Sequence, residues 1–197
     1  MRNITIFPGI PTDQRRTAAA LYWQAFGAKL NRVMGPDPRA LAFFEATMDG
    51  TFALSALGAD GTLLGIAGFK TAKGSLTGGS FRGLANVYGR VGAIWRGLLL
   101  SLLERDLAPD VLVMGGICVA AEARGQGVGS KLLEAILAEA GQRGLASVRL
   151  DVIDNNPRAR ALYERKGFKA RGTTYLGPLK WLFGFDYATE MRRDIGD

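Results

Sequence analysis

A glycine-rich segment at residues 124–129, Arg-Gly-Gln-Gly-Val-Gly, constrains this chain more than any other feature of its sequence. It follows the apolar run Val111–Val119, which is typical of a buried strand, and it leads directly into a helical pattern of apolar residues. Glycines ahead of a helix let the backbone approach a ligand, and the first helical N–H groups favour an anion there. The segment therefore predicts either a phosphate site or a purely structural turn between a strand and a helix.

Two well-known phosphate-binding patterns fit this segment poorly. A Walker A loop requires a glycine immediately before its lysine, whereas Ser130 precedes Lys131. A dinucleotide-binding fingerprint requires its third glycine one residue later than Gly129, although Asp151 imitates the acidic residue that binds ribose. The dinucleotide interpretation stays open, but it leaves Arg124 and the chain after Asp151 without a role.

The chain has 197 residues, with no histidine and one cysteine, Cys118. These counts exclude an imidazole base, a histidine-ligated metal, a disulfide within the chain and a Cys-x-x-Cys site. No metal is therefore expected, and catalysis would rest on carboxylates, tyrosine, lysine, hydroxyls or backbone N–H groups. The low cysteine content suits a reducing compartment, so a cytoplasmic location is expected.

The first residues carry no signal-peptide pattern, and no apolar run approaches the roughly 20 residues that a membrane span needs. The net charge of +7 fits an anionic partner such as a phosphorylated cofactor, an acidic substrate or nucleic acid, and it equally fits simple solubility. Because the basic residues are scattered and do not interleave with aromatic ones, a nucleic-acid partner is not expected.

Alternating and helical patterns of apolar residues predict one domain of the α/β (α+β) class. Strands are expected over residues 3–7, 51–57, 62–69, 111–119, 146–153, 168–175 and 187–193. Helices are expected from Thr12 to about Phe26, from Asp37 onward, over 84–103 with a break near Gly89 and Gly92, from 128 to about 141, and over 157–166. Residues 73–83 are polar and rich in glycine, so they are not expected in the core.

Two spaced motifs give the sequence a specific resemblance. Arg124-x-x-Gly127-x-Gly129 resembles the Q/R-x-x-G-x-G/A signature of the GNAT N-acetyltransferase superfamily, whose loop holds the pyrophosphate of coenzyme A. The segment from Asn156 to Phe168 is similar to the family's N-x-x-A-x-x-L-Y-x-x-x-G-F pattern at every fixed position. The resemblance is strong over residues 111–168 and weak over the first 110. It implies a single domain over residues 1–197, with a mixed, mostly antiparallel central sheet flanked by helices and a helical insertion around 84–107.

By this resemblance, acetyl-CoA is the co-substrate and lies along the strand and the loop. The residues implied to bind its pyrophosphate are Arg124, Gly125, Gln126, Gly127, Val128, Gly129 and Ser130. Backbone groups of Cys118 and Val119 would hold the pantetheine arm, with the Val119 N–H facing the thioester oxygen. The Cys118 side chain itself is interpreted as a small buried hydrophobe. Asn156 would cap the helix that begins at Pro157, contact the cofactor arm, or do both.

The resemblance also implies that an unidentified primary amine attacks the thioester directly, in a ternary complex. Tyr163 is the candidate general acid for the departing thiolate, with aromatic packing as its alternative role. Asp151, twelve residues earlier, is the candidate base, although it is one methylene shorter than the corresponding glutamate of ribosomal-protein N-terminal acetyltransferases. Glu122, Asp154 and Glu45 are further candidates. A non-catalytic acyl-CoA-binding or sensing module is the alternative function.

The chain departs from compact members of the superfamily between Lys70 and Asp110, where they pass quickly from one strand to the next. This insertion is interpreted as a lid over the acceptor site or as a contact surface of a homodimer. Its helix, which includes Trp95 and Arg96, is also compatible with a membrane surface. A buried packing helix is the preferred interpretation.

Overall fold

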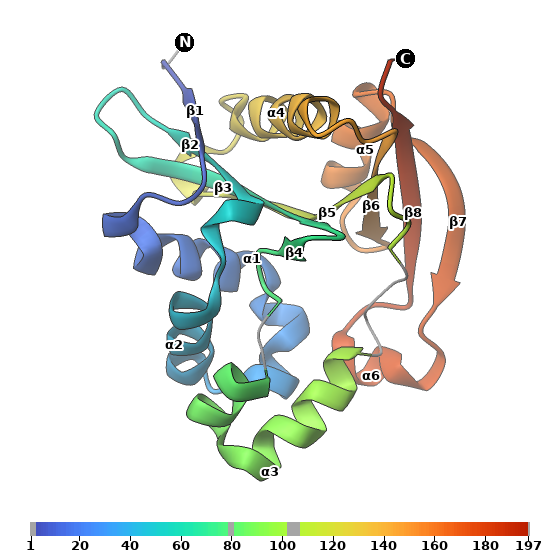
Figure 1. Ribbon diagram of the computed structural model, residues 1–197. Helices are drawn as coiled ribbons and strands as arrows, with labels where there is room; N and C mark the ends of the chain where they lie inside the picture. The colour runs from blue at the N-terminus through green and yellow to red at the C-terminus, as the bar shows by residue number, and fades with distance from the viewer. Residues whose placement is uncertain (1–2, 79–80, 102–106, 197) are drawn as a thin grey trace.

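A single mixed sheet organises the protein in the computed structural model, which describes residues 3–78, 81–101 and 107–196 (Figure 1). Its strand order is β1-β2-β3-β5-β6-β8-β7, and the short β4 pairs with β3. The strands are β1 (Thr5–Pro8), β2 (Ala53–Leu57), β3 (Leu63–Thr71), β4 (Gly74–Ser75), β5 (Val111–Val119), β6 (Ser147–Ile153), β7 (Lys169–Tyr175) and β8 (Tyr187–Asp194). Since β5 and β6 form the parallel pair and the other pairs are antiparallel, the predicted mixed, mostly antiparallel sheet is confirmed.

Helices cover both faces of this sheet. They are α1 (Arg15–Met34), α2 (Asp37–Thr47), α3 (Phe81–Ser101), α4 (Val128–Gln142), α5 (Pro157–Arg165) and the short α6 (Lys180–Phe183). In Figure 1, α4 and α5 lie on one side of the sheet, and α1, α2 and α3 lie on the other. The predicted apolar stripe of α4 is confirmed, because Leu132, Leu133 and Ile136 are completely buried against β2, β3 and β5.

The parallel strands β5 and β6 stay paired over only part of their length. Pairing runs from Val111 opposite Ser147 to Met114 opposite Leu150, whereas the strands themselves continue to Val119 and Ile153. Gly115 is an extra residue at this point, because its neighbours Met114 and Gly116 face consecutive residues of β3. Such a bulge bends a strand and increases its twist. The sheet therefore opens between β5 and β6, at the end of β5 that leads into the glycine-rich segment.

Several predicted boundaries were wrong in the N-terminal half. Thr12 begins a short 3-10 turn instead of capping a helix, and α1 continues to Met34 because Val33 and Met34 extend its buried face. Strand β2 begins at Ala53, because residues 50–52 form a second 3-10 turn. There the Asp49 carboxylate accepts the Thr51 N–H at 3.0 Å.

The glycine-rich stretch 73–83 contributes to the core, contrary to the prediction. Its described part contains β4 and the buried Leu76. Gly74 lies so close to the Phe52 ring that a Cβ would come within 2.6 Å of it. Here glycine permits a close approach of the backbone to an aromatic ring, which polarity and composition alone do not reveal. Residues 79–80 lie outside the described part of the chain.

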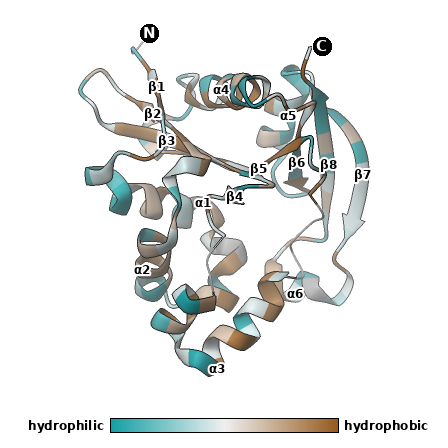
Figure 2. Cartoon of the chain, viewed as in Figure 1, coloured by the Kyte–Doolittle hydropathy of each residue, from teal (hydrophilic) through white to brown (hydrophobic). Residues whose placement is uncertain are grey.

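Helix α3 fills most of the predicted insertion and breaks where expected, since Gly89 has φ 73° and ψ 166°. The Tyr88 hydroxyl donates to the carbonyl oxygen of Met34, which attaches α3 to the end of α1. The interpretation as a buried packing helix is right for its inner face and wrong for its outer face. Leu84 and Ala93 are buried, whereas four apolar side chains are exposed on the helix after the break, as its hydropathy in Figure 2 illustrates: Val91, Ile94, Trp95 and Leu98. The predicted continuation over 102–106 lies outside the described residues.

None of the described helices is long and apolar enough to cross a membrane.

Candidate active site

The glycine-rich loop presents an exposed backbone at the start of α4. Gly125 and Gly127 have φ values of +76° and +84°, and an added Cβ at either would meet no atom within 4 Å. The first hydrogen bond of α4 runs from the Lys131 N–H to the Gly127 oxygen at 3.0 Å. The N–H groups of Val128, Gly129 and Ser130 precede that bond and point out of the helix N-terminus, as in any α-helix. These amides and the helix dipole make the loop a suitable site for a phosphate group.

Side chains of the loop shape its backbone. The Arg124 Nε donates to the Val119 oxygen at 3.3 Å, which folds the loop back onto the end of β5. The Gln126 Nε2 donates to the Glu122 oxygen at 2.6 Å and closes the preceding turn. Gly129 lies between β5 and α5, because a Cβ there would contact the Leu162 and Val119 side chains at 3.6 and 3.9 Å. The structure therefore brings the end of β5, the loop and α5 together.

The predicted helix cap at Asn156 is confirmed. Its Oδ1 accepts the Ala159 N–H at 3.2 Å, and Pro157 occupies the first helical position of α5. The Asn156 side chain is exposed at the surface. A second contact of Asn156 with a cofactor arm stays a prediction.

Tyr163 is buried on α5, with 7% of its surface exposed. Its ring packs 6.0 Å from that of Phe168, measured between centroids. Burial raises the pKa of the Tyr163 phenol to about 12, with a smaller contribution in the same direction from the nearby Cys118 thiol. Cys118 is itself buried, as predicted for its side chain. Tyr163 and Cys118 thus approach each other where β5 has separated from β6.

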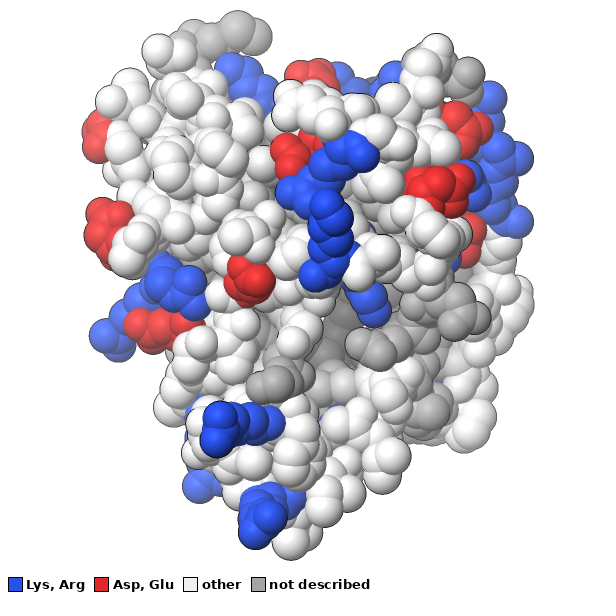
Figure 3. Space-filling view, viewed as in Figure 1, with Lys and Arg blue, Asp and Glu red and all other residues white. Residues whose placement is uncertain are grey.

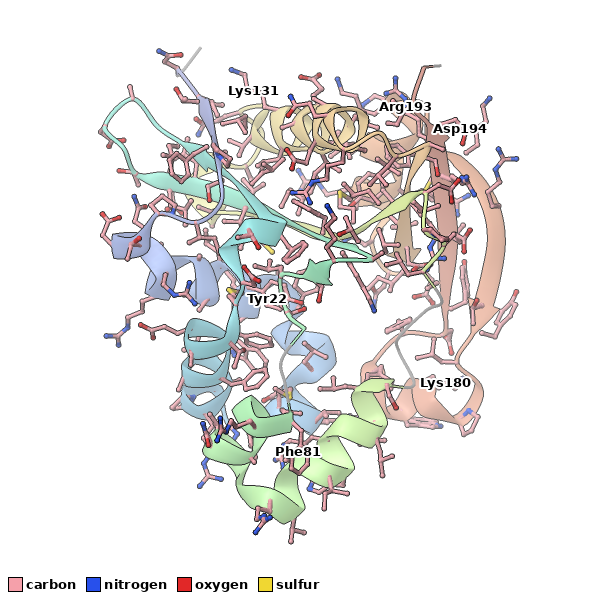
Figure 4. All side chains as sticks on the ribbon, viewed as in Figure 1. Tyr22, Phe81, Lys131, Lys180, Arg193 and Asp194 are labelled. Carbon is pink, nitrogen blue, oxygen red and sulfur yellow. The ribbon has the colours of Figure 1, made fainter. Side chains whose placement is uncertain are left out.

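A cavity of about 810 Å³ lies on the opposite side of the opened sheet. It is bounded by β3, β5, β6 and the inner faces of α1, α2 and α3. The face shown in Figure 3 is hollowed below a column of basic side chains, and Figure 4 places Tyr22 between α1 and the sheet. Aromatic residues form much of the cavity wall: Tyr22, Phe26, Phe43, Phe44, Phe69, Tyr175, Phe183 and Phe185.

Among the four candidate bases, the structure brings Asp151 to this cavity. Asp151 lies on β6 directly opposite Glu190 of β8, and its neighbours Arg149 and Ile153 also line the cavity. Asp154 instead accepts the backbone N–H groups of Asn155 and Asp186 at 2.9 and 3.2 Å. Within the described residues, neither Glu122 nor Glu45 lines this cavity.

The aromatic wall of the cavity was not predicted from the sequence. Tyr22 and Phe26 belong to a helical stripe that also predicts ordinary packing, and they meet Phe44 from another helix. Tyr22 also has a pKa of about 12, raised chiefly by burial, while a hydrogen bond with Thr77 acts in the opposite direction. Because these residues come from distant segments, only the folded chain reveals them as one site. No group of three metal-binding side chains occurs in the described ranges.

Comparison with known proteins places this geometry in a family. The sequence profile of the acetyltransferase (GNAT) family matches residues 17–168, which is most of the chain. The protein belongs to the GNAT acetyltransferase family. The match covers the loop, α5 and most of the N-terminal half, so the GNAT domain includes the region where sequence motifs were weakest.

Among curated proteins, this GNAT chain is similar to the 5-NmdU N-acetyltransferase of Pseudomonas phage PaMx11, with 42% identity over 74 residues. That segment is 38% of this chain and only 50% of the phage protein. Family membership and this relative support acyl transfer in general terms.

Solved structures share the whole fold. A GNAT acetyltransferase from Kribbella flavida superposes with a TM-score of 0.64 at 18% identity, covering 97% of each chain. An N-acetyltransferase from Staphylococcus aureus Mu50 gives the same TM-score and identity, covering 98% of this chain and 99% of that one. At such identities the likeness establishes the GNAT fold of this protein and nothing finer.

Proposed function

We propose that this protein transfers an acetyl group from acetyl-CoA to a primary amine by direct attack within a ternary complex. The observation that carries the proposal is the opening between β5 and β6, with the glycine-rich loop at one end and a large cavity behind it. A thioester held in this opening would be reachable from the cavity. The geometry thus supports two reactants that meet across the sheet without a covalent acyl-enzyme.

The donor side of the proposed site, formed by the end of β5, the glycine-rich loop and α5, consists mainly of backbone groups. The amides that precede the first α4 hydrogen bond would hold the pyrophosphate, because they combine N–H donors with the positive end of the helix dipole. The edge of β5 that β6 has left would pair with the amides of the pantetheine arm. The Val119 N–H would then donate to the thioester oxygen as negative charge develops there. The Cys118 side chain lies in the core beside this edge.

The acceptor side of the proposed site is the cavity bounded by β3, β5, β6, α1, α2 and α3. It would bind the amine and make it available in its neutral form. Asp151 lies at the cavity wall, where it can take a proton from the amine directly or through a water. The amine nitrogen forms the new C–N bond, and the bond between the carbonyl carbon and sulfur breaks. Tyr163 donates its proton to the departing sulfur, since a phenol with a pKa of about 12 is fully protonated near neutral pH. The electron pair leaves with the sulfur, so CoA thiol and amide are the products.

The test combines calorimetry with turnover. Purified protein is titrated with acetyl-CoA, with NAD and ATP as controls, and thiol release is then followed with a panel of amines. We expect micromolar affinity for acetyl-CoA alone and amine-dependent thiol release. Tyr163→Phe should lower kcat by about 100-fold while changing the Kd of acetyl-CoA less than about threefold. Tyr187→Phe, which removes a phenol away from α5, is the matched control.

Each outcome has a clear meaning. A preference for NAD would restore the dinucleotide interpretation of the loop and remove acetyl-CoA from the reaction. Tight acetyl-CoA binding without turnover of any amine would favour the alternative, a non-catalytic acyl-CoA-binding or sensing module. Unchanged turnover in Tyr163→Phe would exclude this residue as the acid.

A further inference from the structure

Most of the exposed large apolar side chains among the described residues lie at the end of the molecule that contains α3 and α6 (Figure 1). Four of them follow the break in α3 with the spacing i, i+3, i+4 and i+7, which places them on one face of the helix: Val91, Ile94, Trp95 and Leu98. We call these four residues the α3 stripe. Val91 and Leu98 are 80% and 65% exposed. Contiguous apolar surface of this kind marks an interaction site, whereas single exposed apolar residues do not.

Helix α3 does not bury this stripe by turning inward, because another of its faces is already in use. Gly97, Leu100 and Ser101 line the cavity. The hydrogen bond from the Tyr88 hydroxyl to the Met34 oxygen attaches the helix to α1. The stripe therefore faces away from the body of the protein.

The short helix α6 adds exposed aromatic surface at the same end. Figure 4 shows Phe81 at the start of α3 and Lys180 on α6 at this end, and both helices border the cavity. Trp181 of α6 is 74% exposed. Two of the three tryptophans of the chain, Trp95 and Trp181, are thus exposed here. Tryptophan is enriched where water meets a lipid bilayer, because its ring is apolar and its N–H is polar.

The charges on α3 are positive. Over its described length, α3 contains Arg82, Arg90 and Arg96 and no acidic residue. Arg82 and Arg90 are exposed, and neither forms a salt bridge with another described residue. The first turn of α2, which packs against α3, adds Arg39 and Asp37, whose charges offset each other. An apolar stripe on a helix that carries only positive charges complements the acyl chains and phosphates of an anionic bilayer.

A second copy of the chain complements this surface less well. A twofold dimer through α3 would place the same stripe and the same arginines on both sides of the interface. Because α3 carries no acidic residue to pair with these arginines, like charges would face each other, which disfavours association.

We propose that the α3 stripe docks on the surface of an anionic lipid bilayer. The four apolar side chains enter the boundary between headgroups and acyl chains, and Arg82 and Arg90 contact lipid phosphates. The inference goes beyond the proposed function and does not depend on it, because lipid binding requires neither acetyl-CoA nor an amine.

The experiment measures sedimentation of the full chain with two kinds of vesicle, phosphatidylcholine alone and equal parts of phosphatidylcholine and phosphatidylglycerol. We expect binding to the anionic vesicles to be at least about tenfold stronger and to weaken as salt is raised. Val91→Ser combined with Leu98→Ser should lower binding to the anionic vesicles at least about tenfold, because apolar burial is lost. Arg82→Gln combined with Arg90→Gln should lower it by a similar factor and reduce the preference for anionic lipid.

Matched controls separate the α3 stripe from apolar surface and charge in general. Phe7→Ser removes an exposed apolar side chain from the edge strand β1. Arg16→Gln combined with Arg171→Gln removes two exposed arginines from α1 and β7. Both controls should bind the anionic vesicles within about threefold of the original protein. Since all the substituted positions are exposed, the urea midpoint of each variant should stay unchanged.

Three results would overturn the inference. The first is the absence of binding to the anionic vesicles. The second is an equal loss in the two pairs of arginine variants, which would mean that net charge and not α3 controls binding. The third is a lipid-free dimer, measured by sedimentation equilibrium, that dissociates in Val91→Ser combined with Leu98→Ser, because it would assign the α3 stripe to a second copy of the chain.

Discussion

Under the proposed function, the two sides of the opened sheet would recognise their ligands by different means. On the donor side, the segment from β5 to α5 offers backbone N–H groups from a loop whose Gly125 and Gly127 have positive φ. On the acceptor side, α1, α2 and α3 offer side chains, with aromatic rings such as Tyr22 and Phe44 4.9 Å apart between centroids. Backbone recognition depends on a few glycines at fixed spacing. Side-chain recognition depends on which residues the fold brings together, so it can vary without changing the fold.

Phe44→Ala tests the acceptor side with the largest expected effect. Phe44 is buried and contacts the rings of Tyr22, Trp23 and Phe43. Truncation should lower the free energy of unfolding by about 3–5 kcal/mol, measured by urea denaturation, and should raise the KM of the amine. The Kd of acetyl-CoA should change less than about threefold.

Phe168→Ala is the matched control for Phe44→Ala, because it removes an equally buried ring on the donor side, next to Tyr163. It should lower stability by a similar amount but reduce kcat more than it raises the amine KM. If Phe44→Ala weakens the binding of acetyl-CoA as much as the binding of the amine, the two sides do not bind their ligands independently.

Gly127→Val tests the donor side. Its φ of +84° is unfavourable for valine, and the side chain would occupy the open space in front of the loop. We expect a loss of acetyl-CoA affinity of at least about 100-fold, or about 2.7 kcal/mol, by calorimetry. Gly144→Val introduces the same strain at a φ of +68° beyond the other end of α4 and should leave the affinity unchanged. Equal losses in the two variants would mean that strain, and not the loop, controls binding.

Asn156 allows a smaller and sharper test, because capping and cofactor contact can be separated there. Asn156→Ala removes the acceptor of the Ala159 N–H and should cost about 1 kcal/mol of stability. Asn156→Asp keeps a capping oxygen but loses the amide donor. If the side chain also binds the cofactor arm, Asn156→Asp keeps the stability of the original protein but binds acetyl-CoA more weakly. An affinity equal to that of the original protein would restrict Asn156 to capping.

The smallest effect is expected from pH. Because burial raises the pKa of Tyr163 from 10.0 to about 12, Tyr163 stays protonated through neutral pH, and kcat should show no alkaline limb from this residue below about pH 10. The raised pKa stabilises the folded state below pH 10, and that contribution is lost as pH rises toward 12. Alkaline unfolding should therefore be delayed in Tyr163→Phe. An activity limb near pH 8 that disappears in Tyr163→Phe would contradict this assignment.

The same contrast explains what the sequence could predict. The local geometry of the loop and of the α5 cap was predictable because Arg124, Gly127, Gly129 and Asn156 act locally, through turns and caps whose spacing is visible along the chain. The mixed, mostly antiparallel sheet followed from the resemblance that those residues carry, and the strands of the C-terminal half followed from their apolar patterns. Site roles such as those of Tyr163 and Asp151 stay predictions until the variants are measured.

The acceptor side was not predictable for a physical reason. Tyr22, Thr77, Arg149 and Phe183 are far apart in the sequence, and each has an ordinary explanation in its own element. The buried Leu76 was missed because its neighbours are polar, and the exposed face of α3 was missed because helical spacing does not tell an inner face from an outer one. Whether that face contacts a second copy of the chain stays a prediction.

The bulge in β5 also links the two sides. Gly116, just after the extra residue, has a φ of +150°, and a Cβ there would collide with the ring of Phe26 on the cavity wall. Any side chain at this position would force Phe26 to rotate or α1 to move outward. Under the proposed function, a change at Gly116 would thus alter the amine-binding cavity and shift the donor strand at once. If the proposed function holds, the missing side chain of Gly116 couples the donor side to the acceptor side, so the two could not change independently at this position.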